Sequence, residues 1–130
     1  MTDNGLILTI DDEHDITEMI ALMLSTSGYR VIEAQSVFEG MKALADCTPD
    51  VILLDVMMPG VDGIRFCETL RSNPATAHVP VIFVSALGKE ADRVVAREAG
   101  AAAYVTKPFT SEQLIGAIRA IVSERQASAV

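Results

Sequence analysis

The chain has 130 residues, a length that suits one domain with one core. Hydrophobic residues make up 50% and charged residues 22%, as in an ordinary globular α/β protein. The formal net charge of -8 argues against a general nucleic-acid or anionic-membrane surface, both of which need basic patches. No apolar run approaches the roughly 20 residues of a membrane span, and the first residues lack the features of a signal peptide.

The first half of the chain alternates short apolar runs with helical repeats. Residues 6–10 form an apolar run that ends in an acidic pair, and we read it as the first strand. Apolar residues then repeat at helical spacing up to Gly28, a stop signal, and residues 29–32 predict a brief second strand. Ser36, with Glu39 three residues later, predicts a capped second helix. The predicted inward-facing residues are Ile16, Met19, Ile20, Met23 and Leu24 in the first helix and Val37, Met41 and Leu44 in the second.

Residues 51–54 are four apolar residues that lead directly into Asp55. A continuous apolar run of this kind is typical of a strand buried on both faces of a parallel sheet. A carboxylate on such a strand is costly unless it is paired, hydrated or bound to metal. Asp55 therefore marks a candidate site.

The second half continues the alternation after a loop through Pro59-Gly60. The elements that follow are a helix ending at Asn73-Pro74, a strand at 81–84, a helix at 89–99, a strand at 102–105 and a last helix capped by residues 110–113. The predicted inward-facing residues are Ile64, Cys67 and Leu70 in the third helix and Leu114, Ile115, Ile118, Ile121 and Val122 in the last.

Five strands alternating with five helices predict an α/β fold with a parallel sheet and right-handed crossovers. We expect a single domain over residues 1–130, with a core from about 6 to 122 and an unstructured tail from 123 to 130. The alternation alone does not fix the order of the strands. Cys47 and Cys67 have neither CxxC spacing nor a histidine cluster nearby, so we expect reduced thiols and a cytoplasmic setting.

Four of the predicted strands end in, or lead to, polar residues. In a parallel sheet these ends share one edge, where ligands bind. The expected cluster has three carboxylates, one hydroxyl and one ammonium, contributed by Asp11, Asp12, Asp55, Ser85 and Lys107.

This cluster predicts a cation site with phosphoryl chemistry. Carboxylates about 4 Å apart repel by roughly 4 kcal/mol at a surface-like dielectric, more than one lysine can offset. An open, all-oxygen site suits Mg2+, and the backbone carbonyl of Met57 offers a neutral oxygen. Asp55 beside a metal can act as a nucleophile toward phosphorus, with Lys107 and Ser85 contacting the transferring group. The expected product is an acyl phosphate on Asp55.

The chain resembles response-regulator receiver domains, the flavodoxin-like fold typified by the chemotaxis protein CheY. The resemblance covers about residues 6–122 and rests on matches in type, order and spacing at Asp11-Asp12, at Asp55 with residues 58–63, at Ser85-Ala86 and at Lys107-Pro108-Phe109. It implies strand order 2-1-3-4-5 and Mg2+-dependent transfer from a histidine kinase or a histidine phosphotransfer protein. It also implies a moving surface made by the fourth helix, fifth strand and last helix, and a cis peptide before Pro108 that aims Lys107 inward.

The resemblance also implies roles for single residues. Asp12 and Asp55 hold the metal together with the carbonyl of Met57, and Asp11 acts chiefly through water. Ser85 and Tyr104 are the switch pair, in which Ser85 moves toward the phosphoryl group and the ring of Tyr104 swings into the vacated space.

Each of these residues also has a plain structural interpretation. The acidic pair can simply begin the first helix, where acids are favoured. Ser85 alone would more often be a strand-end hydroxyl, and Tyr104 alone would more often be half-buried packing. We expect Met57 and Met58 to lie in a loop over the site without chemistry of their own, and His14 to be a solvated helix residue.

Three other functions fit the sequence less well. A phosphatase with an aspartate nucleophile usually has a second acid two residues later, where this chain has Met57. A nucleotide or flavin module needs a phosphate-binding loop after the first strand, where Asp11-Asp12-Glu13 repel phosphate. A receiver-like interaction module that is not phosphorylated, or the receiver fragment of a hybrid kinase or larger regulator, stays an alternative.

The output is expected to pass through protein contacts. No effector domain follows residue 122, so we expect no direct nucleic-acid binding by this chain, no membrane, and a downstream protein target or fused output domain.

We expect a monomer when the chain is unphosphorylated. Ala102 and Ala103 stand where receivers that dimerise through this surface often carry an acidic pair, so we also expect no salt-bridged dimer on phosphorylation. A stable symmetric dimer on that surface, seen by analytical ultracentrifugation, would contradict this.

Overall fold

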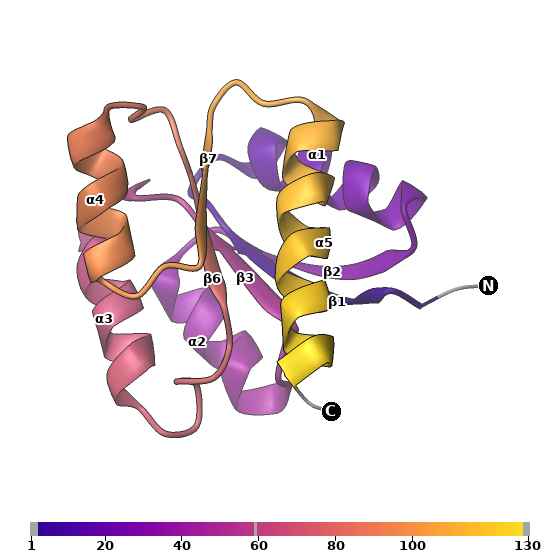
Figure 1. Ribbon diagram of the computed structural model, residues 1–130, viewed down its shortest axis with the longest axis horizontal. Coiled ribbons are helices and arrows are strands. Elements are labelled where there is room, and N and C mark those ends of the chain that lie inside the picture. Colours follow the sequence, from indigo (N-terminus) through magenta and orange to yellow (C-terminus); the bar gives the residue numbers. More distant parts are fainter. Residues whose placement is uncertain (1–2, 59, 129–130) are drawn as a thin grey trace.

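The structure is a computed structural model that describes residues 3–58 and 60–128, without the side chains of residue 61 and residues 125–128. Strands and helices alternate along the chain except that the short strands β4 and β5 follow β3 directly (Figure 1). Their bounds are β1 (Gly5–Ile10), α1 (His14–Thr26), β2 (Tyr29–Ala34), α2 (Val37–Asp46), β3 (Val51–Leu54), β4 (Met57–Met58), β5 (Val61–Asp62), α3 (Gly63–Ser72), β6 (Val81–Ser85), α4 (Glu90–Glu98), β7 (Ala103–Thr106) and α5 (Ser111–Ser128).

The large sheet of the described residues has five strands in the order β2-β1-β3-β6-β7, and all neighbours are parallel. Since β6 and β7 are the fourth and fifth strands of this sheet, the order 2-1-3-4-5 implied by the family resemblance is confirmed. Helices α1 and α5 cover one face, and α2, α3 and α4 cover the other (Figure 1). The predicted α/β fold is therefore confirmed.

Strand β3 lies at the centre of this sheet and is buried on both faces. Its side chains alternate between the two layers: Val51 and Leu53 pack in the layer with α1 and α5, and Ile52 and Leu54 pack in the other layer. All four are at most 1% exposed. The continuous apolar run that predicted this strand reflects two separate cores, one on each face.

Two predicted core residues are not in the core, because their helices are rotated from the expected positions. Met19 on α1 is 39% exposed and Met41 on α2 is 43% exposed. In α1 the buried position is taken by Thr17, whose hydroxyl donates to the carbonyl of His14. In α2 it is taken by Gly40, whose absent side chain lets the helix approach β1 closely.

The segment after β3 differs from the predicted loop. It contains the short antiparallel pair β4–β5. Met58 is 7% exposed, belongs to the core on the α2–α3–α4 side and lies in strand β4, so it is not a loop residue. Pro59, predicted in the loop, lies outside the described residues.

The expectation of an unstructured tail from residue 123 was wrong up to residue 128. Helix α5 continues to Ser128, because the residues after Val122 are mostly good helix formers. Residues 129 and 130 lie outside the described part of the chain. No helix in the described part is long and apolar enough to span a membrane.

Candidate functional site

Three carboxylates meet at the edge of the sheet where the parallel strands end. Asp11 follows β1, Asp12 comes next in the chain, and Asp55 follows β3. One carboxylate oxygen from each lies within 4.8 Å of the others. Asp11 and Asp55 are buried, whereas Asp12 is exposed. The sequence-predicted acidic cluster is thus present, with one open side.

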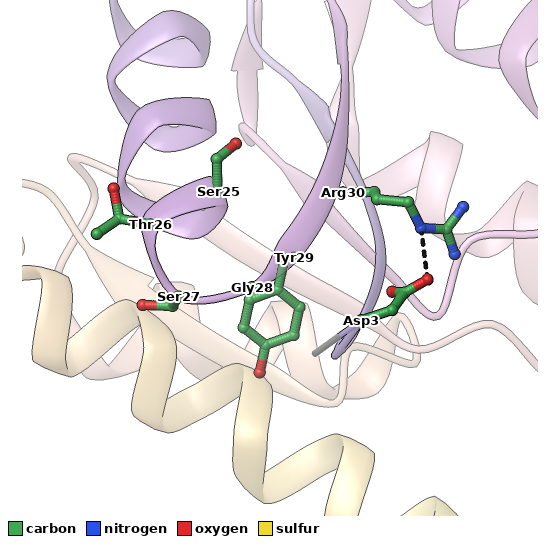
Figure 2. Close-up of a pocket in the computed structure, with 7 residues that line it drawn as sticks. All are labelled: Asp3, Ser25, Thr26, Ser27, Gly28, Tyr29 and Arg30. Carbon is green, nitrogen blue, oxygen red and sulfur yellow. Dashed lines mark ion pairs between the residues drawn. The ribbon is translucent and has the colours of Figure 1, made fainter. Parts of the chain in front are cut away.

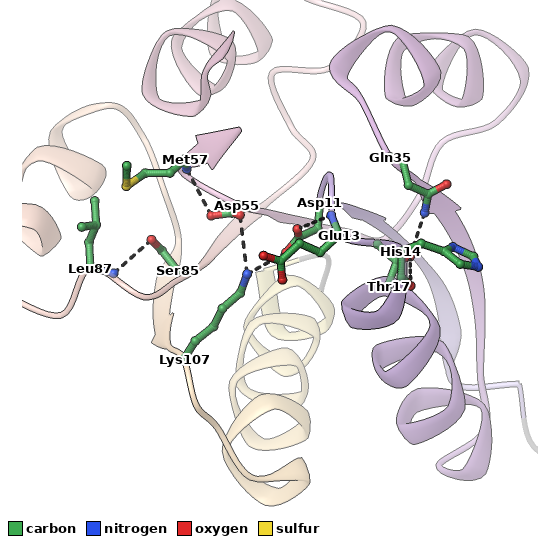
Figure 3. Close-up of polar contacts among 10 residues, drawn as sticks. All are labelled: Asp11, Glu13, His14, Thr17, Gln35, Asp55, Met57, Ser85, Leu87 and Lys107. Atoms are coloured by element: carbon green, nitrogen blue, oxygen red, sulfur yellow. Dashed lines mark hydrogen bonds and ion pairs between the residues drawn. The ribbon is translucent and has the colours of Figure 1, made fainter. Parts of the chain in front are cut away.

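Lys107 brings a positive charge into this cluster from the end of β7. Its Nζ lies 2.7 Å from Oδ2 of Asp11 and 3.5 Å from Oδ2 of Asp55 (Figure 3). The peptide bond from Lys107 to Pro108 is cis. Burial lowers the pKa of Lys107, but its hydrogen bond to Asp11 and the two negative charges outweigh burial, so the pKa lies above its usual value. The side chain is therefore a persistent cation between two acids.

The pKa of Asp55 is raised by its surroundings in the folded protein. Burial raises the pKa of Asp55 above its usual range, and the negative charge of Asp11 adds to this. The backbone N–H of Met57, which donates to Oδ1 of Asp55 at 3.1 Å, and the ammonium of Lys107 both act in the opposite direction. A bound cation would supply the positive charge that Lys107 alone does not.

The donor set fits a magnesium ion. Mg2+ takes about six oxygens at about 2.1 Å, so oxygens around one ion lie about 3 to 4 Å apart. The three carboxylate oxygens lie within 4.8 Å of one another, close to this spacing, and the exposed position of Asp12 leaves room for coordinated waters. Asp11, Asp12 and Asp55 are the residues that would hold the ion.

A hollow of about 730 Å³ opens in front of Asp55. Two further acids line it that sequence reasoning did not assign to the site. Glu13 follows the acidic pair, and Asp62 caps α3 by accepting hydrogen bonds from two backbone N–H groups. The sequence signals for Asp62 were its place before Gly63 at a helix start and its position in the stretch 58–63 that carried the family resemblance. The hollow is lined by Asp12, Glu13, Asp55, Val56, Met57, Met58, Asp62 and Leu87.

Ser85 and Tyr104 are joined through one loop residue. Ser85 ends β6, is 1% exposed, and its Oγ accepts a hydrogen bond from the N–H of Leu87 at 3.2 Å. The hydroxyl of Tyr104 donates to the carbonyl of Leu87. Burial of the half-buried Tyr104 raises the pKa of its hydroxyl. The predicted switch pair is thus connected by contacts through Leu87. Figure 3 shows Ser85, bonded to Leu87, beside Asp55 and Lys107.

His14 and the two cysteines lie elsewhere. His14 is exposed and pairs with Glu18 at 3.4 Å, as expected of a solvated helix residue. Cys47 and Cys67 are free thiols that donate to backbone carbonyls.

A second hollow, of about 650 Å³, lies at the opposite edge of the sheet (Figure 2). Tyr29 begins β2 and pairs with Gly5, the first residue of β1, whereas the carboxylates follow the last residues of their strands. Its one ion pair, between Arg30 and Asp3 at 3.0 Å, is exposed. This hollow gathers no group that the phosphoryl chemistry needs.

The chain matches the model of the response regulator receiver domain family over residues 7–119. It belongs to this family. Receiver domains are phosphoacceptor signalling modules and not enzymes with an external substrate. In this receiver domain, Asp11, Asp12 and Asp55 form the acidic group typical of a Mg2+ site.

Known relatives of this receiver domain are both longer regulators and isolated domains. It is 38% identical over 116 residues to the phosphate regulon transcriptional regulatory protein PhoB of Pseudomonas aeruginosa, covering 89% of this chain and 51% of that protein. It resembles the Francisella response regulator 1452 receiver domain (29% identity, TM-score 0.86, 94% and 99% of the two chains). It also resembles the signal receiver domain of a histidine kinase from Syntrophus aciditrophicus (30% identity, TM-score 0.83, 92% and 91%). The receiver domain spans about half the length of the curated relatives it matches.

Asparagine in place of Asp55 should stabilise this receiver domain in the absence of Mg2+. At neutral pH we expect a gain on the order of 1 kcal/mol in the free energy of unfolding, because the variant no longer buries an ionised carboxylate beside Asp11. Since the pKa of Asp55 is raised on folding, the folded state keeps its proton to higher pH than the unfolded chain. Ionisation of Asp55 therefore lowers the free energy of unfolding as the pH rises from the usual pKa of aspartate through the pKa of Asp55 in the folded state.

Urea unfolding in EDTA over a pH series measures this effect. The difference in the free energy of unfolding between Asp55→Asn and wild type should be small in acid. It should reach its full size above the pKa that Asp55 has in the folded state. Asp62→Asn is the matched control, because Asp62 is exposed and asparagine is also a good N-cap residue. A less stable Asp55→Asn variant at neutral pH would contradict the prediction.

Proposed function

We propose that this receiver domain accepts a phosphoryl group on Asp55 from a histidine kinase or a histidine phosphotransfer protein, with Mg2+, and signals through its α4–β7–α5 surface. One observation supports the proposal above the others. Lys107 lies between Asp11 and Asp55 at the open edge of the sheet, beside the three carboxylates that can hold the ion. A carboxylate, a group of acids that fits a cation and a fixed positive charge so close together support phosphoryl transfer to Asp55.

In the proposed reaction a carboxylate oxygen of Asp55 attacks phosphorus. The new O–P bond forms as the P–N bond to the donor imidazole breaks, and the imidazole leaves as the neutral base once it has taken up a proton. Mg2+ supplies charge neutralisation for the phosphoryl oxygens. Lys107 offers its ammonium to one of these oxygens, which requires that it turn from Asp11 toward Asp55. Ser85 offers its hydroxyl to another.

The direct test is incubation with acetyl phosphate, followed by intact mass spectrometry. Wild type should gain the mass of one phosphoryl group in Mg2+ and none in EDTA, and Asp55→Asn should gain none. Asp62→Asn serves as the control, because it changes an exposed carboxylate of the same hollow and should still be labelled. Labelling of Asp55→Asn, or labelling of wild type that does not need Mg2+, would refute the proposal.

The acyl phosphate should be long-lived, because two residues beside Asp55 are apolar. Met57, which is 63% exposed, and Leu87 both line the hollow, and neither side chain can orient an attacking water by hydrogen bonding. We expect Met57→Asn to lose its phosphoryl group about fivefold faster, the factor that one added hydrogen bond of about 1 kcal/mol provides.

Loss of the added mass after removal of acetyl phosphate gives this rate. Met41→Asn, at another exposed methionine, should decay like wild type. Slower decay in Met57→Asn than in wild type would contradict the prediction.

The partners belong to the same proposal. Because the receiver domain spans about half of its curated relatives, a fused output domain or a separate protein target can read the α4–β7–α5 surface. Likeness to the receiver domain of a histidine kinase favours a second candidate, in which this chain is the receiver part of a hybrid kinase. Free thiols at Cys47 and Cys67 support a cytoplasmic setting.

A further inference from the structure

Asp12 differs from the other two carboxylates of the acidic cluster in how its side chain is held. The carboxylate of Asp11 accepts a hydrogen bond from Lys107, and that of Asp55 accepts one from the N–H of Met57. No other described residue donates a hydrogen bond to the carboxylate of Asp12 or forms an ion pair with it. The position of this carboxylate is therefore set by the backbone on either side of Asp12.

The backbone before Asp12 is fixed by two hydrogen bonds of Asp11. The N–H of Asp11 donates to the carbonyl of Ala34 at 3.1 Å, and Oδ1 of Asp11 accepts a hydrogen bond from the N–H of Glu13 at 3.0 Å. On the helix side, Glu13 is the N-cap residue of α1, but its side chain makes no capping hydrogen bond. The first turn of α1 thus lacks the side-chain cap that usually stabilises the start of a helix.

Thr17 and Gln35 hold this first turn in another way. The hydroxyl of Thr17 donates to the carbonyl of His14 at 3.0 Å, and Nε2 of Gln35 donates to Oγ1 of Thr17 at 2.8 Å. Thr17 is fully buried and Gln35 is half-buried, which strengthens these hydrogen bonds relative to exposed ones. Figure 3 shows Gln35 pointing toward Thr17 and the start of α1, where His14 lies.

The backbone of Gln35 is itself anchored at the start of α2. Its N–H donates to Oε1 of Glu39 at 3.2 Å, and Oγ of Ser36 accepts a hydrogen bond from the N–H of Glu39 at 3.1 Å. Since β1 and β2 are paired strands, Gln35 connects the segments that follow two neighbouring strands. Neither Gln35 nor Thr17 lines the hollow of the acidic cluster, so any effect on that cluster passes through the backbone of α1.

We propose that Gln35 is a positioning residue for Asp12 and holds it, through Thr17 and the first turn of α1, where it can bind Mg2+. The inference rests on the magnesium site of the proposed function and goes beyond it. A ligand that already lies where the ion needs it loses little conformational freedom on binding, whereas a mobile ligand must first be ordered. The hydrogen bond from Gln35 to Thr17 therefore raises the affinity of the acidic cluster for Mg2+.

The first measurement is Mg2+ binding without a phosphodonor, followed by NMR through the backbone amide signals of residues 11–13 and 55–57. Gln35→Met keeps the length of the side chain and removes the donor. Its dissociation constant for Mg2+ should be about fivefold higher than that of wild type, less than the roughly 10- to 100-fold change usual for a residue that contacts a metal ligand directly.

Variants of Thr17 test whether Gln35 acts through its hydroxyl. Thr17→Val should weaken Mg2+ binding at least as much as Gln35→Met. The double variant should bind Mg2+ no more weakly than Thr17→Val alone, because the two side chains belong to one chain of hydrogen bonds. Thr17→Ser keeps the hydroxyl and should bind Mg2+ like wild type.

The matched control is Asn4→Leu, which removes a side-chain amide at the other end of the same helix. Nδ2 of Asn4 donates to the carbonyl of Ser27, the C-cap residue of α1, at 2.7 Å. Asn4→Leu should leave the dissociation constant for Mg2+ unchanged.

The second measurement is the Mg2+ dependence of the labelling rate with acetyl phosphate. In Gln35→Met the Mg2+ concentration that gives half of the maximal rate should rise by the same factor as the dissociation constant. The rate at saturating Mg2+ should stay at the wild-type value, because the bound ion then orders Asp12. A merely structural role would lower the free energy of unfolding in urea without changing the dissociation constant.

The outcomes separate this inference from the proposed function. If wild type shows no Mg2+-dependent shifts, the magnesium site fails and the inference fails with it. If wild type binds Mg2+ but gains no phosphoryl mass, the proposed phosphoryl transfer fails, and the NMR titration alone decides the role of Gln35.

If Gln35→Met and Thr17→Val bind Mg2+ with the wild-type constant, only the role of Gln35 is overturned, whatever the stability of the two variants. If Gln35→Met does not fold, Gln35→Ala takes its place, because alanine removes the same donor and adds no apolar bulk to a half-buried position.

Discussion

Methionine in place of Lys107 should slow phosphoryl transfer to Asp55 by at least about a hundredfold, because loss of a single fixed group that stabilises transition-state charge costs about that much in enzymes. The Nζ of Lys107 is already 3.5 Å from Asp55 and is held there by Asp11. Methionine keeps the length of the side chain and removes its charge. The measurement is the initial rate of mass gain with acetyl phosphate at saturating Mg2+.

The control for this rate is Lys42→Met. Lys42 lies on α2, where its ammonium is over the ring of Phe38, and its removal changes the net charge equally. Lys42→Met should be phosphorylated at the wild-type rate. A Lys107→Met rate within about threefold of wild type would show that the ammonium does not act on the transferring group.

Folding has to be measured separately, because Lys107 also balances a buried charge. The side chain of Asp11 is 3% exposed, and Lys107→Met leaves it without its cation. In EDTA we expect the free energy of unfolding to fall by about 3 kcal/mol, the usual cost of breaking a buried pair by removing one partner. Adding Asp11→Asn should recover part of this loss, since the uncompensated charge is then gone.

The sequence predicted the fold and the acidic cluster for one shared reason. In a parallel sheet buried on both faces, every polar residue that ends an apolar run lies at the same edge. The strand ends at Asp55 and Ser85 could therefore be assigned to one site without any knowledge of side-chain positions. The order of the strands, by contrast, came only from the family resemblance, because alternation of strands and helices is compatible with several orders.

The features that the sequence did not predict have a different cause. They depend on how each helix is rotated about its axis and on contacts that side chains make between elements. Met19 and Met41 have helical spacing, but Thr17 and Gly40 take the inward positions because a hydroxyl finds a backbone partner and a glycine allows close approach. The contact of Arg93 with Tyr104 joins a helix surface to the next strand, and no periodicity in the sequence marks such a pair. These features depend on distances between elements, which patterns within one element do not contain.

Alanine in place of Gly63 should destabilise the protein by about 2 kcal/mol. The reason is the short distance between the start of α3 and the backbone that carries Asp55. Gly63 begins α3, and a Cβ there would lie 2.7 Å from the backbone oxygen of Asp55 and 2.9 Å from Cα of Val56. Because the obstructing atoms belong to the backbone, no side-chain rotation can relieve the contact. The strand end that carries Asp55 must move.

Phosphorylation should therefore fall together with stability in Gly63→Ala, since a small displacement of a nucleophile can cost as much as a hundredfold in rate. Urea unfolding and mass gain with acetyl phosphate measure the two effects. Gly116→Ala is the matched control, because a Cβ at this position in α5 meets nothing within 4 Å. It should stabilise the chain by about 0.5 to 1 kcal/mol through helix propensity and leave the labelling rate unchanged. Equal stability of Gly63→Ala and wild type would show that the backbone of residues 55 and 56 adapts without cost, and that the close approach of α3 does not position Asp55.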